Sequence, residues 1–488
     1  MSDSSPKAST SGEGAAAPSA PVGTRQFLQL FTAVMLPMFM AAVDQTLLAT
    51  ATPVIAQELG GLRDTSWIAV GYLLAAAATT PMYGRFGDRY GRRNTLLVSL
   101  GIFTVGSVAC AASQSLAMLV AARVLQGIGG GGLMTLCQAL IGELVLPRER
   151  ARFQGYFAAM FSLASVGGPV IGGLVVSHGS WRWLFLINVP LAALAVWRLL
   201  TLPAVKPKPS NASHDFAGIF LFAGAIVVTL YWLSSGGHRF AWGSGTSLAL
   251  GAASAVLFAA LVVYERRQSH PFLPLELLRL PAISFCAATT LLFAACMFAM
   301  IFFLPVYLQI GYRTSAVASG LLILPMTLGM VTGSTASGRI VARTGRPRWV
   351  PVTGMGLASA ALVALSLVSA TPGAVATLGF VVGMGFGTVM PTMQVTVQTV
   401  AGRERLGAAT SIVSLSRSLG AATGTALFGA LVFALMPETD LAHLSEHVRG
   451  AEAETFVPAF HKAFLVAAAV AALSAFAASR VPDVRLKG

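Results

Sequence analysis

A short basic segment between two long apolar runs constrains this chain more than any other feature. It reads Gly84-Arg85-Phe86-Gly87-Asp88-Arg89-Tyr90-Gly91-Arg92-Arg93. An apolar run of about 20 residues is long enough to cross a bilayer, and a basic loop between two such runs stays in the cytoplasm. The segment is therefore predicted to be a cytoplasmic loop, and this placement fixes the orientation of every other span.

The composition supports a polytopic membrane protein. Of 488 residues, 55% are hydrophobic and only 10% are charged, whereas soluble domains carry about 25% charged residues. The net charge of +14 is spread over short clusters between apolar runs, which argues against a nucleic-acid partner. The four cysteines all fall inside apolar runs and show neither disulfide nor metal spacing: Cys110, Cys137, Cys286 and Cys296.

The apolar runs lack the alternation of strands, so an all-α fold of about 14 transmembrane helices is predicted. The expected spans are 27–50, 66–84, 95–113, 116–141, 154–177, 183–201, 216–234, 246–264, 283–309, 316–337, 349–369, 373–399, 407–435 and 460–480. Clusters of arginine and lysine occupy every second gap, and the other gaps hold single cations. This bias places both termini in the cytoplasm.

A weaker copy of the basic segment, Gly338 to Arg346, indicates two related halves, as in many secondary transporters. Residues 1–24 are rich in Ser, Ala, Gly and Pro and are expected to be a disordered tail without the apolar core of a cleaved signal peptide. The remaining expected parts are a six-helix bundle (25–203), a linker (204–215), an inserted helix pair (216–270), a second six-helix bundle (271–482) and a tail (483–488).

Several motifs now resemble those of one family. Residues 84–93 resemble the cytoplasmic signature between the second and third helices of the major facilitator superfamily, and Arg123, Gln126, Gly127 and Gly129 look like its fourth-helix motif. Residues 43–53 and 181–190 resemble motifs of its fourteen-span drug:proton antiporters. The resemblance is dense in the amino-terminal half, and the carboxy-terminal half matches mainly through its weaker loop copy and its layout.

That resemblance implies a proton-coupled exporter of the multidrug type in a bacterial cytoplasmic membrane. Its partners would be protons, the lipid bilayer and an amphiphilic small molecule, it would need no cofactor, and we expect a monomer. A lipid or natural-product exporter on the same scaffold, with the extra helix pair as a wall toward lipid, is the alternative. The substrate would sit between the bundles, against apolar walls rich in Met, Phe and Tyr.

Three charged residues lie inside predicted spans and are candidates for proton coupling or substrate binding. Asp44 is the only acid well inside a span, and an intramembrane carboxylate is costly unless it faces a cavity or a partner. Arg123 keeps its charge and must be paired or hydrated. In the resembled family this arginine is associated with proton coupling. Arg417 is a similar cation in the second half and could balance Asp44. The alternative for Asp44 is a permanent structural pairing or a hydrated position near a helix end. The alternative for Arg123 is a structural tether to a backbone carbonyl or a polar side chain.

The basic segment is also expected to form a cytoplasmic latch between the bundles. Asp88 would suit the positive amino-terminal end of a helix from the opposite half, and Glu143 is a plausible partner for Arg89 or Arg92. The copy in the second half has no acid at the matching position. The full expected latch is Gly84, Gly87, Asp88, Arg89, Gly91, Arg92 and Glu143.

A glycine-rich fifth span resembles the antiporter signature of the exporters, where this helix lines the interface between halves. Small residues let helices approach closely and proline bends a helix. The motif residues are Gly155, Gly167, Gly168, Pro169, Gly172 and Gly173. Ordinary packing of small residues is the alternative.

Two further patterns fit enzyme signatures. Residues 127–132 fit GxGxxG but have neither a preceding strand nor a βαβ unit, which excludes a dinucleotide site. His443 to His447 fits the HxxEH metallopeptidase pattern, although a solvated loop explains it more simply. We therefore expect no enzyme and no metal, with a membrane metallopeptidase as a remote alternative.

Overall fold

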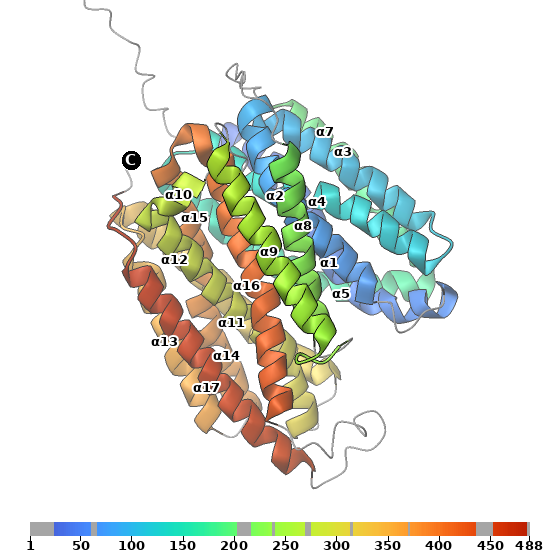
Figure 1. The fold of residues 1–488 in the computed structure, drawn as a ribbon, viewed down its shortest axis with the longest axis vertical. Helices are drawn as coiled ribbons and strands as arrows, with labels where there is room; N and C mark the ends of the chain where they lie inside the picture. The colour runs from blue at the N-terminus through green and yellow to red at the C-terminus, as the bar shows by residue number, and fades with distance from the viewer. Residues whose placement is uncertain are drawn as a thin grey trace, which may run out of the picture.

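The computed structural model describes residues 24–59, 66–202, 216–236, 240–268, 275–312, 316–368, 371–435 and 452–485. Within these ranges the regular elements are helices, apart from one isolated bridge between Gly236 and Phe240. The all-α prediction is thus confirmed. Figure 1 shows two groups of long helices, one from each half of the chain, with α8 and α9 in front of them.

The amino-terminal group contains seven helical segments around two apolar clusters. Ser115 accepts a hydrogen bond from the backbone of Met118 and so caps α4, and Pro147 starts α5, a position where proline loses no helical bond. The segments are α1 (Thr24–Leu59), α2 (Ser66–Tyr90), α3 (Arg92–Ala111), α4 (Leu116–Leu144), α5 (Pro147–His178), α6 (Trp183–Leu186) and α7 (Asn188–Leu200).

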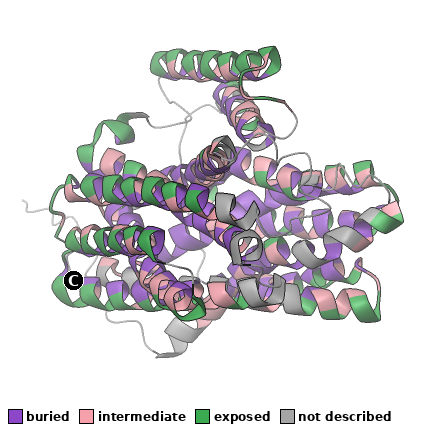
Figure 2. Ribbon diagram, turned by 90° about the horizontal axis from the view of Figure 1, so that it is seen from below, coloured by how far each residue is buried: buried purple, intermediate pink, exposed green. Residues whose placement is uncertain are grey.

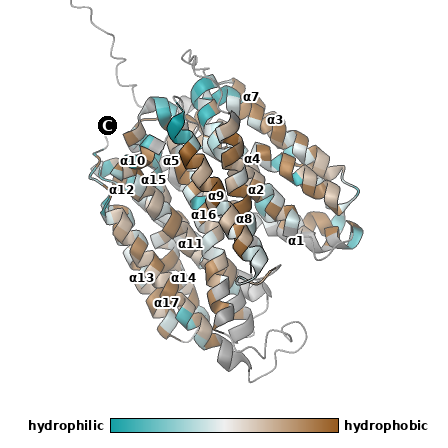
Figure 3. Ribbon diagram, viewed as in Figure 1, coloured by the Kyte–Doolittle hydropathy of each residue, from teal (hydrophilic) through white to brown (hydrophobic). Residues whose placement is uncertain are grey.

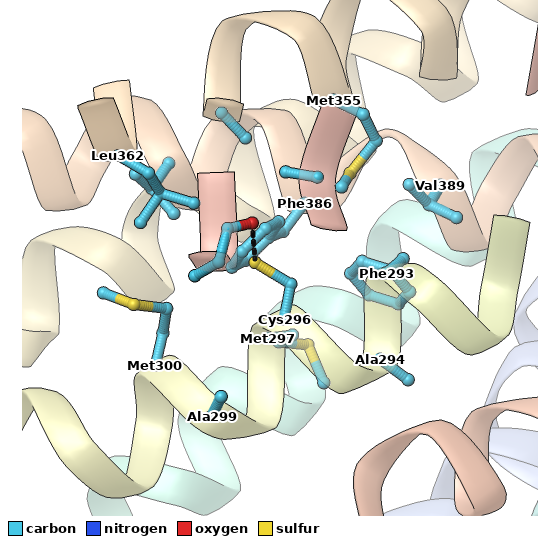
Figure 4. Close-up of a cluster of buried hydrophobic side chains, with 14 of the residues drawn as sticks. Phe293, Ala294, Cys296, Met297, Ala299, Met300, Met355, Leu362, Phe386 and Val389 are labelled. Carbon is cyan, nitrogen blue, oxygen red and sulfur yellow. Dashed lines mark hydrogen bonds between the residues drawn. The ribbon is translucent and has the colours of Figure 1, made fainter. Parts of the chain in front are cut away.

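The carboxy-terminal group packs around one large cluster, part of which is drawn in Figure 4. In that view Phe293, Met297 and Met300 of one helix lie near Phe386 and Leu362 of its neighbours. The segments are α10 (Leu275–Arg279), α11 (Pro281–Tyr312), α12 (Ala316–Thr344), α13 (Trp349–Leu367), α14 (Pro372–Gly387), α15 (Val389–Ala401), a 3-10 turn (Arg403–Arg405), α16 (Leu406–Ala434) and α17 (Glu452–Ser479).

The remaining pair, α8 (Phe216–Ser235) and α9 (Gly245–Arg267), covers the line where the two groups meet. Apolar side chains of α8, including Phe222 and Ile226, pack with Ala78 of α2 and with Leu415 and Leu419 of α16. The α9 helix is mostly exposed. In Figure 2 the buried residues gather inside the molecule and the exposed ones lie at its periphery.

Ten helical segments in the described ranges are long and apolar enough to cross a bilayer. Figure 3 shows hydrophobic residues along the lengths of the helices and hydrophilic residues gathered near their ends. Helices also occupy all the apolar ranges predicted from the sequence. The chain is therefore a multi-pass membrane protein, and fourteen crossings remain a prediction.

The prediction of a loop over residues 84–93 is wrong in length, because the structure has a much shorter break there. Helix α2 continues to Tyr90 and α3 begins at Arg92, so the break is Gly91 alone. Gly91 has φ 89°, and Gly345 has φ 65° after α12 at the matching place in the other half. A positive φ is easy only for glycine, whereas the arginines and the aspartate of the segment are compatible with a helix. The chain therefore turns at one residue.

Candidate functional site

A buried ion pair lies inside the amino-terminal group. Asp44 of α1 and Arg123 of α4 are 2.6 Å apart between Oδ2 and Nη1, and they are 3% and 1% exposed. The Nε of Arg123 also donates to the backbone oxygen of Ile68 at 3.0 Å. Two charges removed from water need this kind of mutual pairing and additional hydrogen bonds.

Three uncharged polar side chains complete the pair. Gln126 donates to Asp44 Oδ1 at 2.7 Å and accepts from Arg123 at 2.5 Å. Asn188, the first residue of α7, donates to Asp44 Oδ1 at 3.3 Å. The hydroxyl of Ser107 on α3 accepts from both Gln126 and Asn188. We call these five residues the Asp44 network. It joins α1, α3, α4 and α7 and satisfies the carboxylate fully in its charged form.

Aromatic rings enclose the cation of the network. The guanidinium of Arg123 lies 4.4 Å from the ring centre of Tyr72 and 5.9 Å from that of Phe185. A cation over an aromatic face is attracted by the ring quadrupole, more so when it is desolvated. Arg123 therefore has a second set of partners that would persist if Asp44 lost its charge.

Arg417 lies apart from the network. Its Nη2 is 3.9 Å from the sulfur of Met134 on α4, and Met134 lies eight residues, about 12 Å of helix, beyond Gln126. The described partners of Asp44 are instead Arg123, Gln126 and Asn188. The structure brings Asp44 and Arg123 together, and it places Arg417 at the interface between the two groups.

Asp88 contacts the start of a helix from the other group. Its Oδ1 accepts from Gly407 N at 2.9 Å and its Oδ2 from Ala408 N at 3.1 Å. These amides belong to the first turn of α16, where backbone N–H groups have no helical partner and the helix dipole is positive. We call the end of the molecule that holds this contact the Asp88 end.

Two arginines lie close to Asp88 in the sequence, and one of them binds it. Arg92 donates to Asp88 Oδ1 at 2.6 Å and lies 3.0 Å from Glu143 Oε2 on α4. The guanidinium of Arg89 lies 5.5 Å from the ring centre of its neighbour Tyr90. Of the two partners expected for Glu143, Arg92 is the one the structure shows.

The helices α2 and α16 approach closely beside Asp88. A Cβ atom on Gly84 would overlap Ser411 and the backbone of Gly407, and one on Gly407 would overlap the backbone of Gly84. Gly87 packs in the same way against Leu136 of α4. The two facing glycines are therefore required for the contact between the halves at this end.

The glycines of the fifth span serve different contacts. Gly155 faces Thr335 of α12, so it lies between the two halves, whereas Gly168 faces Thr46 of α1. A Cβ atom on Gly167 would meet only Ile171, and one on Gly173 would meet nothing within 4 Å. Gly172 is buried, the side chain of Pro169 is outside the described set, and α5 stays helical through both.

A third charged cluster lies at the carboxy-terminal end of α1 and was not predicted from the sequence. Glu58 accepts from Arg182 at 2.5 Å and from the ring N–H of Trp181 at 2.7 Å. Arg182 also donates to the backbone oxygen of Ser113. The hydrogen bond from Arg182, followed by that from Trp181, lowers the pKa of Glu58 below its ordinary value of 4.5.

The structure describes one of the two enzyme-like patterns, residues 127–132. Gly127 and Gly129 lie inside α4, where a side chain would overlap the backbones of α2 and α3, so the run of glycines serves helix packing. His443 to His447 lies outside the described residues. Within the described part of the chain, no group of three or more His, Cys, Asp or Glu could hold a metal ion.

Comparison with known proteins identifies the family. Residues 34–425 match the model of the Major Facilitator Superfamily. The chain is 38% identical over 404 residues to an uncharacterized MFS-type transporter of Mycobacterium tuberculosis. The aligned part is 82% of this chain and 59% of the relative. It is 32% identical to the multidrug transporter protein MdtP of Bacillus subtilis over 83% of this chain and 75% of the relative.

A third relative is the tetracenomycin C resistance and export protein of Streptomyces glaucescens, 34% identical over 82% of this chain and 75% of the relative. Solved structures support the fold. The human organic anion transporter MFSD10 aligns with a TM-score of 0.62 at 16% identity over 91% of this chain and 99% of its own. The proton:xylose symporter XylE aligns with a TM-score of 0.64 at 13% identity, over 94% and 97%. The chain therefore belongs to the major facilitator superfamily, a family of membrane transporters and not of enzymes.

Proposed function

We propose that this transporter is a proton-coupled antiporter that exports lipophilic small molecules, cationic or neutral, across a bacterial cytoplasmic membrane. In this proposal the chain crosses the membrane fourteen times as a monomer, with both termini and the Asp88 end in the cytoplasm. The relatives named as multidrug or export proteins support the export direction. The observation that carries the proton coupling is the buried pair of Asp44 and Arg123.

The Asp44 network supplies two states. With Asp44 ionised, the carboxylate holds Arg123 and accepts from Gln126 and Asn188. A proton that reaches Asp44 neutralises it and turns one oxygen into a donor, so its attraction for Arg123 falls. Arg123 then keeps Tyr72 and the Ile68 oxygen. Because the Asp44 network joins four helices, gaining or losing the proton changes how those helices hold together.

The Asp88 contact supplies the gate. While Asp88 holds the first turn of α16, the two halves are joined at the proposed cytoplasmic end. Releasing it lets α2 and α16 separate there and opens the space between the halves to the cytoplasm. Rocking of two halves around a site at the membrane midplane is the general mode of such carriers. Proton binding at Asp44 would bias this motion through α1 and α4.

The test is efflux from inverted vesicles under an imposed pH gradient, with Asp44→Asn. The amide keeps an acceptor for Gln126 but carries no titratable proton, so we expect loss of gradient-driven transport with substrate exchange retained. Glu58→Gln is the matched control, because it removes a carboxylate of the same helix outside the network. Gradient-driven efflux that survives in Asp44→Asn would remove Asp44 from the mechanism.

A second candidate function is export of a natural product, and the Streptomyces relative named for tetracenomycin C favours it. It uses the same scaffold and the same proton coupling, and it differs only in cargo. The same vesicles distinguish the two when tetracenomycin C is compared with synthetic lipophilic cations. Transport of tetracenomycin C alone would assign the natural-product function.

A further inference from the structure

A second buried polar cluster lies between the two halves, away from the Asp44 network. It contains Gln138 of α4, Gln394 and Gln398 of α15, and Thr410 of α16. Gln138 is 8% exposed and the other three are at most 2% exposed. Amide side chains in such positions are expected to be fully hydrogen-bonded.

The hydrogen bonds of the cluster come from its glutamine nitrogens. Gln394 and Gln398 each donate from Nε2 to the hydroxyl oxygen of Thr410, at 3.0 and 3.1 Å. Gln398 also donates to the backbone oxygen of Gln138 at 3.2 Å, across the interface between the halves. Gln398 thus uses both of its N–H groups inside the cluster, and Gln394 uses one.

Two acceptors of the cluster are unused. The side-chain oxygens of Gln138 and Gln394 are buried and have no hydrogen-bond partner. An unpaired buried acceptor lowers stability, so it calls for a compensating role. The two oxygens come from different halves, which is the arrangement of groups that line a path between them.

The cluster lies directly behind the Asp88 contact. Thr410 follows Ala408, whose amide binds Asp88, by two residues. Gln138 precedes Glu143, which binds Arg92, by five residues, or about 7.5 Å of helix. When the Asp88 end opens, these glutamines are among the first buried polar groups reached from that side.

We propose that the oxygens of Gln138 and Gln394 accept hydrogen bonds from the N–H or O–H groups of the transported molecule as it enters from the Asp88 end. This rests on the proposed exporter function and names its substrate class. The cluster offers neutral acceptors and contains no acid, so it suits singly charged or neutral amphiphiles that carry an amine or a hydroxyl. A cation without such a donor gains nothing from these oxygens.

Two monovalent lipophilic cations separate donor recognition from simple charge. Ethidium carries two amino groups, and tetraphenylphosphonium carries no hydrogen-bond donor. Their Kd values are measured on the purified full-length protein for wild type, Gln138→Met and Gln394→Met. Methionine keeps the length of the side chain and removes its amide oxygen together with its N–H donors. The matched control is Gln268→Met at the end of α9, outside both the cluster and the Asp44 network.

We expect each cluster variant to raise the Kd of ethidium about fivefold, the value of one hydrogen bond of average strength, and to leave the Kd of tetraphenylphosphonium within about twofold. Gln394→Glu keeps the acceptors and should restore ethidium binding. The unchanged tetraphenylphosphonium Kd also reports correct folding.

Equal effects on both cations, or no effect on either, would show that the oxygens are only hydrated and would overturn the proposal. If the variants give that result and the wild-type protein still transports both cations in the vesicle assay, the exporter function stands and only the proposed site is refuted. A wild type that neither binds nor transports either cation refutes the proposed substrate class together with the site.

Discussion

Replacing Asp88 by asparagine gives the sharpest test of the gate. The carboxylate accepts from Gly407 N and Ala408 N at 2.9 and 3.1 Å, and from Arg92 at 2.6 Å. Asparagine keeps one oxygen for one of these donors. Its amide nitrogen must then face another donor, and the charge that attracts both Arg92 and the amino-terminal end of α16 is gone.

The structure sets the size of the effect. A hydrogen bond to a charged group contributes about 1.5–3 kcal/mol, and a charge at a helix terminus adds about 0.3–1 kcal/mol. Because asparagine retains part of the contact, we expect the closed Asp88 end to lose about 2–3 kcal/mol relative to the open one. That corresponds to a shift of roughly 30- to 150-fold toward the open end.

Distances between spin labels on the two halves measure this shift. Asn94 of α3 and Arg346 after α12 are exposed near the Asp88 end, and the four native cysteines are buried, so cysteines introduced at the two positions can be labelled selectively. The distance distribution should move to longer values in Asp88→Asn. Glu276→Gln serves as the control, since its ion pair with Arg405 is exposed. An unchanged distribution in Asp88→Asn would refute the gate.

Three further outcomes follow from the same structure. Asp44→Asn leaves Arg123 buried without its counter-ion, so it should lower the free energy of unfolding by about 3–5 kcal/mol. The double variant, Asp44→Asn with Arg123→Met, should recover much of that loss. A double variant that is as unstable as the single one contradicts the pairing. Gly407→Ala should push α16 from α2 and lengthen the same label distance, whereas Gly373→Ala, which has open space, should not. The pKa of Glu58 is lowered in the fold, so the contact stabilises the protein above the ordinary value of 4.5 and its contribution disappears as pH falls through the lowered pKa. The difference in melting temperature between wild type and Glu58→Gln should accordingly be present at pH 7 and vanish in acid, and a difference that persists in acid would assign it to another cause.

The sequence indicated the architecture well because membrane spans are local features. The length of the apolar runs alone located the long helices, without any knowledge of long-range contacts, although it missed the short helix α10. The turn at Gly91 was misjudged for the opposite reason. A polar composition suggested a loop, but polar residues continue a helix easily, and only the glycine with positive φ ends it.

The partners of Asp44 could be predicted only in part. Arg123 was recognised as a buried cation, yet nothing in the sequence joined it to a carboxylate 79 residues away. Asn188 and Ser107 were missed, although a polar residue inside an apolar run is a usable signal. The glutamines behind the Asp88 contact were missed as well, because their importance lies in two unused oxygens, which only coordinates reveal.

The position of α8 has a consequence for the mechanics of the transporter. Its side chains meet both α2 and α16 through apolar contacts, and dispersion contacts have no fixed register, unlike hydrogen bonds. A helix that packs on two moving bodies through such contacts lets both of them move against it. The halves can slide beneath it at little energetic cost, so the resistance to their motion is concentrated at the polar groups on the inner faces.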